Sequence, residues 1–240
     1  MDITKLTKPA RKALKLKTCG AVIVAAGSAS RMKGIDKILT PLAGTPVLGR
    51  TLAAFQACDA VAEIVIVTRP DLILAVTDLS KAFPKVRAVV AGGKTRQDSV
   101  AAGLGALSKD CGLAAIQDGA RPLVTWQLID RTVRAANTYG AAAPAIPVKD
   151  TIKVVKSGLV LATPDRATLQ AVQTPQVFDF DLLRGALSKA EEEKAAVTDD
   201  CSAVERLGMS VKIVEGDERN LKVTTPLDLK IAEMLLEEET

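Results

Sequence analysis

The chain has 240 residues, of which 48% are hydrophobic, and a formal net charge of +4, as is ordinary for a globular protein with a sizeable core. The modest charge, the aromatic content of 2% and the lack of a long apolar run disfavour a nucleic-acid-binding surface and a membrane span. Histidine is absent, which excludes a Ser-His-Asp triad, a histidine base and a histidine-ligated metal, and leaves reactions driven by charge neutralisation, such as nucleotidyl transfer.

Residues 1–18 are basic and precede the first apolar run. They lack the apolar core and cleavage site of a secretory signal, so we expect a basic extension followed by a single domain over 19–240. The four cysteines are scattered without a C-x-x-C pair, which is typical of reduced thiols. The sequence therefore predicts a cytoplasmic protein.

Apolar strands and amphipathic helices alternate over the first 140 residues. The run GAVIVAAG at 20–27 is short, apolar and bounded by glycines, as in a strand buried on both faces. Further strands are expected at 63–68, 86–92 and from 113, with helices at 46–57, 70–83, 96–107 and 126–139. This alternation predicts an α/β fold with a mainly parallel sheet flanked by helices.

The pattern changes from about residue 143, where proline and threonine recur. The segment TIKVVKSGLVLAT predicts a hairpin that turns at Ser157 and Gly158. A hairpin has little core of its own, so we expect it to pack on another surface, such as a second subunit. Helices at 179–195 and 198–208, a strand at 210–216 and a closing helix from 224 are expected beyond it.

Three loops follow the expected strands at the sheet edge where ligands bind in parallel α/β folds. The first, GSASRMKGIDK, combines small residues with Arg31, Lys33 and Lys37, as in an anion-binding loop, although it is neither a G-x-G-x-x-G motif nor a P-loop. The second, AGGKTRQDSV, begins a helix, whose first N–H groups attract anions. Taken alone, each loop is as compatible with an ordinary turn as with an anion-binding site.

The third loop, QDGARP, places Asp118 and Arg121 three residues apart at a strand end. Such a pair forms either a local ion pair or a position for a metal ion or a substrate hydroxyl. Together the three loops favour a site for an anionic small molecule.

Eight segments in series resemble the 2-C-methyl-D-erythritol 4-phosphate cytidylyltransferase family of the non-mevalonate isoprenoid pathway. They extend from about residue 19 to 236 and read AAGSASRM, DKILTPLAGTPVL, AGGKTRQDSV, QDGARP, PVKDTIK, TPDR…QTPQVF, VTDDCSAVE and EGDERNLKVTTPLDL. The resemblance implies a Rossmann-like nucleotidyltransferase domain and a protruding β-arm, about residues 147–171, that embraces the partner of a homodimer. It also implies attack of methylerythritol phosphate on CTP, with Mg²⁺ and release of pyrophosphate.

The resemblance also implies a role for individual residues. Arg31, Lys37 and Lys222 are expected as catalytic cations. CTP is expected to contact Ala25, Ala26, Gly27, Gly93, Lys94, Ser99 and Gly119, with Arg96 supporting the loop. Methylerythritol phosphate is expected to contact Asp118, Arg121, Thr151, Arg166 and Thr198, with the arm residues Thr151 and Arg166 acting across the dimer interface. Asp118 is a weak candidate Mg²⁺ ligand, since the phosphates of CTP hold most of the ion.

This chain departs from the family pattern at four positions. Ala29 stands where a second glycine is usual, and Lys94 where an acidic residue is common. Gly119 replaces the more frequent alanine, and Asp200 replaces a glutamate. The backbone shape of the first loop and the contact made by Lys94 are therefore open from the sequence.

Two alternative functions are compatible with the sequence. A ribitol-5-phosphate cytidylyltransferase would share the fold and differ in the arm residues. A non-catalytic nucleotide-binding module would need no transition-state cations, which Arg31, Lys37 and Lys222 argue against. A Rossmann oxidoreductase is disfavoured because the glycine motif is missing.

Overall fold

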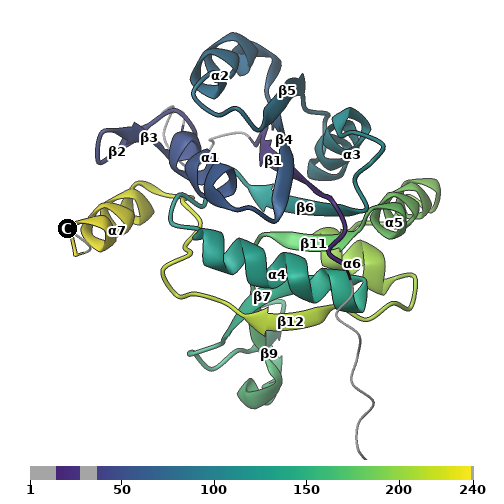
Figure 1. Ribbon diagram of the computed structural model, residues 1–240. Coiled ribbons are helices and arrows are strands. Elements are labelled where there is room, and N and C mark those ends of the chain that lie inside the picture. The colour runs from purple at the N-terminus through teal and green to yellow at the C-terminus, as the bar shows by residue number, and fades with distance from the viewer. Residues whose placement is uncertain (1–14, 28–36, 239–240) are drawn as a thin grey trace, which may run out of the picture.

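The computed structural model describes residues 15–27 and 37–238. Its main sheet has the strand order β10-β7-β11-β6-β1-β4-β5, and β12 also pairs with β7 (Figure 1). The strands span Cys19–Ala25 (β1), Val61–Thr68 (β4), Val86–Ala91 (β5), Leu113–Asp118 (β6), Ala141–Pro147 (β7), Gln170–Val172 (β10), Gln176–Asp179 (β11) and Lys212–Glu215 (β12). The four central strands are parallel, whereas β11 and β10 run antiparallel to their neighbours. The predicted α/β fold with a mainly parallel sheet is confirmed.

Helices cover both faces of this sheet and divide the core in two (Figure 1). One face packs α1 (Val47–Ala57), α2 (Ile73–Ser80) and α4 (Trp126–Tyr139), and the other packs α3 (Arg96–Ala106), α5 (Phe180–Glu192) and α6 (Asp200–Glu205). Strand β1 serves both layers because its side chains alternate: Ile23 faces α1 and α4, and Val22 faces α3. The sheet is thus buried on both sides, as its apolar strands require.

The expected helix at 70–83 is shorter than its pattern suggests. A 3₁₀ turn at Pro70–Leu72 precedes α2, which ends at Ser80. The closing helix α7 (Pro226–Glu237) packs beside the small ladder of β2 (Pro41–Leu42) and β3 (Thr45–Pro46).

Strands β7 and β11 are not predicted by the local sequence pattern. The β7 segment consists mostly of alanine and proline, which are depleted in strands. It nevertheless pairs with β10, β11 and β12, and most of its residues are buried. Pairing with segments distant in the chain overrides the weak local preference here.

The hairpin expected at Ser157 and Gly158 is present and stands apart from the main sheet. It pairs β8 (Val154–Lys156) with β9 (Leu159–Ala162) and projects from the sheet at the bottom of Figure 1. The φ angles of Ser157 and Gly158 are 51° and 80°, and two positive φ angles are what a tight hairpin turn of this length requires.

Only part of the basic extension falls in the described residues, because residues 1–14 lie outside them. Lys17, near its end, pairs with Asp179 at 2.7 Å, and its backbone N–H donates to Asn137. Whether 1–18 and 19–240 are separate units therefore stays a prediction.

The four cysteines are free and buried. Burial raises the pKa of the Cys111 thiol to about 11, so this thiol is protonated near neutral pH. Among the residues that the structure describes, no helix is long and apolar enough to cross a membrane.

Candidate active site

A cavity of about 330 Å³ opens at the carboxyl ends of β1, β5 and β6. Its lining comes from segments far apart in the chain: Val24, Ala25, Ala26, Gly27, Lys37, Ile38, Arg69, Gly93, Lys94, Thr95, Arg96, Ser99, Asp118, Ala120 and Lys222. Parallel strands bring their carboxyl ends to one edge of the sheet, so the three loops that follow them converge. Cationic side chains dominate the charged groups of this lining, as an anionic ligand requires.

The loop after β1 enters the cavity through Ala25, Ala26 and Gly27. Small side chains are needed here because the loop after β5 lies close by: a Cβ atom built on Gly92 of that loop would lie only 2.5 Å from the Cβ of Ala26. The first loop and the β5 loop therefore approach each other closely. Arg31, Ala29 and Lys33 lie outside the described residues, so the role expected of Arg31 stays a prediction.

The loop after β5 is held at the start of α3 by hydrogen bonds of its own. Thr95 and Asp98 form a capping box, in which each side chain accepts from the other's backbone N–H. The Ser99 hydroxyl donates to the Thr95 carbonyl at 3.0 Å and accepts from the Gly93 N–H at 3.2 Å. The first turn of α3 is thus pre-formed beside the cavity, where its N–H groups favour anions and polar ligand edges.

Asp118 is buried at the end of β6 and has three cationic neighbours. Its carboxylate oxygens lie 2.9 Å from Lys222 Nζ, 3.6 Å from Arg121 Nε and 3.9 Å from Arg96 Nε. Burial alone would raise the pKa of the Asp118 carboxyl, but Lys222 and then Arg96 outweigh it and hold the pKa below its ordinary value. Asp118 is therefore ionised and orders the cations around it.

Lys222 reaches this carboxylate from the segment between β12 and α7. The next residue, Val223, donates its N–H to the Ala120 carbonyl at 2.8 Å, which anchors the segment against the β6 loop. The Lys222 side chain is 42% exposed, so its ammonium group remains accessible from the cavity. A residue distant in sequence thus completes the cationic lining.

Gly119 and Arg121 lie outside the cavity lining. The Gly119 N–H donates to the Val24 carbonyl at 2.9 Å, and a Cβ atom at this glycine would lie 3.1 Å from that of Ala25. Arg121 Nη1 donates to the Asn220 carbonyl at 2.6 Å. In this structure both residues support the loops around the cavity, and Arg121 forms a local ion pair with Asp118. The ligand contacts expected of Gly119 and Arg121 stay predictions.

Three further residues expected to bind the second substrate do not line the cavity of this chain. Thr151 and Arg166 are exposed in the arm, where Arg166 Nη1 donates to the Lys149 carbonyl at 2.7 Å. Thr198 is exposed before α6, and its N–H donates to the Ser202 hydroxyl. Their expected contacts remain predictions.

Arg69 is a cavity residue that the sequence interpretation missed. It directly follows β4 and pairs with Asp71 at 3.2 Å. The sequence did contain a signal for Arg69, because this residue directly follows a predicted parallel strand, whose carboxyl end lies at the same edge of the sheet as the other loops. Asp200 was missed as a partner of Arg96 because nothing local links the two residues.

The donor set of the cavity fits a divalent cation held mostly by a nucleotide. Among the residues that the structure describes, Asp118 is the only carboxylate in the lining, and no three acidic or cysteine side chains cluster as a metal site. Mg²⁺ is commonly bound through one or two carboxylates together with substrate phosphates.

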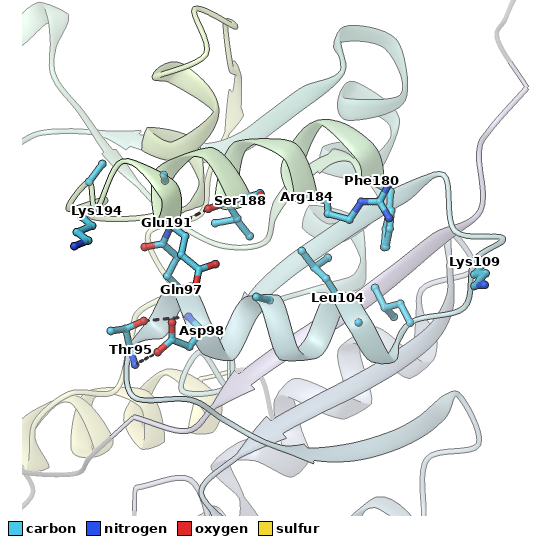
Figure 2. Close-up of a pocket in the computed structure, with 16 residues that line it drawn as sticks. Thr95, Gln97, Asp98, Leu104, Lys109, Phe180, Arg184, Ser188, Glu191 and Lys194 are labelled. Atoms are coloured by element: carbon cyan, nitrogen blue, oxygen red, sulfur yellow. Dashed lines mark hydrogen bonds between the residues drawn. The ribbon is translucent and has the colours of Figure 1, made fainter.

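A larger cavity of about 520 Å³ lies between α3 and α5, and Figure 2 shows its lining. Phe180 and Arg184 lie toward one end, and Thr95 and Asp98 toward the other. Apolar side chains such as Leu104 and Leu187 contribute to it. Its charged lining is mixed, because acidic side chains accompany the cations; these residues are Lys109, Arg184, Lys194, Asp98 and Glu191. The smaller cavity is therefore the better match for an anionic nucleotide.

Comparison with known proteins decides the family. The sequence profile of the 2-C-methyl-D-erythritol 4-phosphate cytidylyltransferases (IspD) matches residues 19–238. The chain belongs to this family. It is a cytidylyltransferase of isoprenoid precursor biosynthesis.

Curated relatives and solved structures agree with this family. The chain is 47% identical over 221 residues to the enzyme of this name from Caldanaerobacter subterraneus subsp. tengcongensis, covering 90% of this chain and 97% of that one. It is also 47% identical to that from Halalkalibacterium halodurans, covering 91% and 96%. The crystal structure of 4-diphosphocytidyl-2C-methyl-D-erythritol synthase from Anaerococcus prevotii superimposes with a TM-score of 0.84 at 31% identity, covering 92% of this cytidylyltransferase and 96% of that chain.

Proposed function

We propose that this chain transfers CMP from CTP to 2-C-methyl-D-erythritol 4-phosphate, which yields 4-diphosphocytidyl-2-C-methyl-D-erythritol and pyrophosphate. The observation that carries this function is the cavity at the carboxyl ends of the strands, in which Lys37, Lys94 and Lys222 surround the buried carboxylate of Asp118. All four residues lie within the segment 19–238 that matches the family. The four free cysteines support a cytoplasmic location.

The chemistry needs no general base. A phosphate oxygen of methylerythritol phosphate attacks the α-phosphorus of CTP and forms a new P–O bond, while the bond to the bridging oxygen breaks and its electron pair leaves with pyrophosphate. The attacking oxygen is already ionised near neutral pH, so no proton has to be removed. This agrees with a sequence that contains no histidine.

The chain contributes charge and orientation to this step. Lys37 and Lys222 supply positive charge where the α-phosphoryl oxygens and the leaving pyrophosphate gain negative charge, and such fixed cations act most strongly in the transition state. Asp118 fixes the position of Lys222. The loop of Gly93, Lys94 and Ser99 at the start of α3 is suited to the cytosine and ribose.

A divalent cation fits this arrangement as a partner of the nucleotide phosphates. When bound, Mg²⁺ supplies further positive charge to the triphosphate. Asp118 is the residue that would contact it, since among residues 15–27 and 37–238 it is the one carboxylate that lines the cavity.

A pyrophosphate-release assay tests the function directly. The protein is incubated with Mg²⁺ and CTP, UTP or ATP, and each nucleotide is offered methylerythritol phosphate or ribitol 5-phosphate. We expect pyrophosphate only with CTP and methylerythritol phosphate. Release with ribitol 5-phosphate would instead identify the related cytidylyltransferase, and nucleotide binding without any release would identify a binding module.

The β8–β9 hairpin supports a homodimer. Both of its strands are exposed along their whole length, and all their residues except Lys156 are apolar, with Leu159 72% and Leu161 63% exposed. Contiguous exposed apolar surface is typical of an interaction site. A second copy that covers this arm would bury those side chains. The arm would then bring Thr151 and Arg166 toward the cavity of that second copy.

The double variant Leu159→Lys/Leu161→Lys tests this dimer. Charged side chains in an apolar interface would be desolvated without partners, so we expect the variant to elute as a monomer and to lose affinity for methylerythritol phosphate. Size-exclusion chromatography with light scattering measures the mass. Leu74→Lys is the matched control, because Leu74 is 86% exposed on α2, outside the arm. A monomeric wild type, or an unchanged double variant, would contradict the proposed dimer.

A further inference from the structure

Asp200 is a buried carboxylate outside the cavity that reaches a cavity residue. Its Oδ2 atom lies 2.7 Å from Nη2 of Arg96, and the residue is only 1% exposed. The Arg96 side chain, in turn, belongs to the lining. Burying a carboxylate is costly unless a partner compensates it, and Arg96 is the cation that compensates Asp200.

The backbone around Asp200 is tied to the main sheet. Gln176, in β11, accepts hydrogen bonds through Oε1 from the N–H groups of Asp200 and Cys201, both at 3.1 Å. Its Nε2 donates to Asp199 at 2.8 Å. Asp200 is the first residue of α6, and Asp199 caps that helix. The carboxylate is therefore presented to Arg96 from a rigid support.

Arg96 lies between two carboxylates at unequal distances. Its guanidinium is 2.7 Å from Asp200 but 3.9 Å from Asp118. Burial alone would lower the pKa of Arg96, but Asp200, together with Asp118 and Asp199, outweighs it and raises that pKa, so the guanidinium is charged. Burial also raises the pKa of the Asp200 carboxyl, and Arg96 is the group that opposes this rise. Since attraction falls with distance, Asp200 holds the arginine, and Asp118 is left with Lys222 at 2.9 Å.

We infer that Asp200 is a positioning residue for CMP transfer, which keeps Arg96 from moving onto Asp118 and displacing Lys222. This inference rests on the proposed function. Without the charge of Asp200, Asp118 becomes the ion-pair partner toward which Arg96 is drawn. Lys222 then loses its placement beside the cavity, and the first turn of α3, which begins at Arg96, shifts with the guanidinium.

A double-mutant cycle tests this role by the steady-state kinetics of CMP transfer. Asp200→Asn keeps the shape of the side chain and removes its charge, so we expect kcat to fall by ~10²-fold, the size of effect that a misplaced group can have, with a smaller change in KM for CTP. In an Arg96→Gln background the same change should alter kcat less than about twofold, because Asp200 acts through Arg96. A merely structural residue would instead give additive losses.

Two further variants keep the result interpretable. Asp181→Asn is the matched control, since Asp181 pairs with Arg184 at 2.9 Å on the exposed side of α5 and should leave kcat unchanged. If Asp200→Asn does not fold, Asp200→Glu replaces it in the same cycle, because glutamate keeps the charge but moves it by one methylene. We expect Asp200→Glu to lower kcat less than Asp200→Asn would. This loss should also disappear in the Arg96→Gln background. Equal losses in both backgrounds, or none, would overturn the inference. An inactive wild type would overturn the proposed function instead.

Discussion

Lys222→Ala should lower kcat for CMP transfer by ~10³-fold, the loss typical of removing one cation that neutralises a phosphoryl-transfer transition state. Lys222 is held 2.9 Å from Asp118, and its segment is anchored by the hydrogen bond from Val223 to Ala120. Alanine removes the charge but leaves this backbone contact in place. The KM for CTP should therefore change much less than kcat, because the lost interaction strengthens as charge develops on the phosphates.

Steady-state pyrophosphate release measures this effect, and Lys81→Ala controls for loss of a lysine ion pair. Lys81 also lies 2.9 Å from an aspartate, Asp78, but on the exposed side of α2, so its variant should keep the wild-type kcat. Lys37→Ala is expected to resemble Lys222→Ala, since Lys37 lines the same cavity. Near-wild-type kcat in both Lys37→Ala and Lys222→Ala would refute the assignment of these cations.

Asp118→Asn should lower the free energy of unfolding at pH 7 by about 3 kcal/mol, as is usual when one member of a buried ion pair is removed. Asp118 is the shared counterion of Lys222, Arg121 and Arg96. Asparagine keeps the shape but withdraws the negative charge, so the three cations repel one another and the buried Arg121 loses its carboxylate partner. Urea denaturation of wild type and variant at the same ionic strength measures the difference.

The pH dependence of that difference is a second, independent readout. The pKa of Asp118 is lower in the folded chain than its ordinary value, so its contribution to stability is complete above about pH 4 and is lost as the pH falls through the folded pKa. The gap between wild type and Asp118→Asn should therefore narrow below about pH 4. Asp78→Asn, an exposed carboxylate paired with Lys81, should show little change at any pH. A gap that stays constant into acid would contradict the ionised Asp118.

Much of the fold could be predicted from the local pattern of apolar and polar residues alone. The apolar runs of β1, β4, β5 and β6, each followed by an amphipathic helix, allow little other than a parallel sheet with two covered faces. Strands β7 and β11 could not be predicted in this way. Their segments lack a strand-like pattern, and they are ordered by pairing with neighbours that come from elsewhere in the chain.

The candidate site could likewise be predicted from the sequence only in part. The class of reaction follows from the residues: a chain without histidine, with cationic, glycine-rich loops after parallel strands, favours transfer between anions. The eight family segments imply that CTP and a sugar-alcohol phosphate are the substrates. Which side chains contact one another depends on tertiary packing and could not be predicted. This packing turned Arg121 toward Asn220, brought Arg69 into the lining and placed Asp200 against Arg96. Sequence spacing determines which face of a strand or helix a residue occupies, but burial and ion pairing depend on what packs against that face.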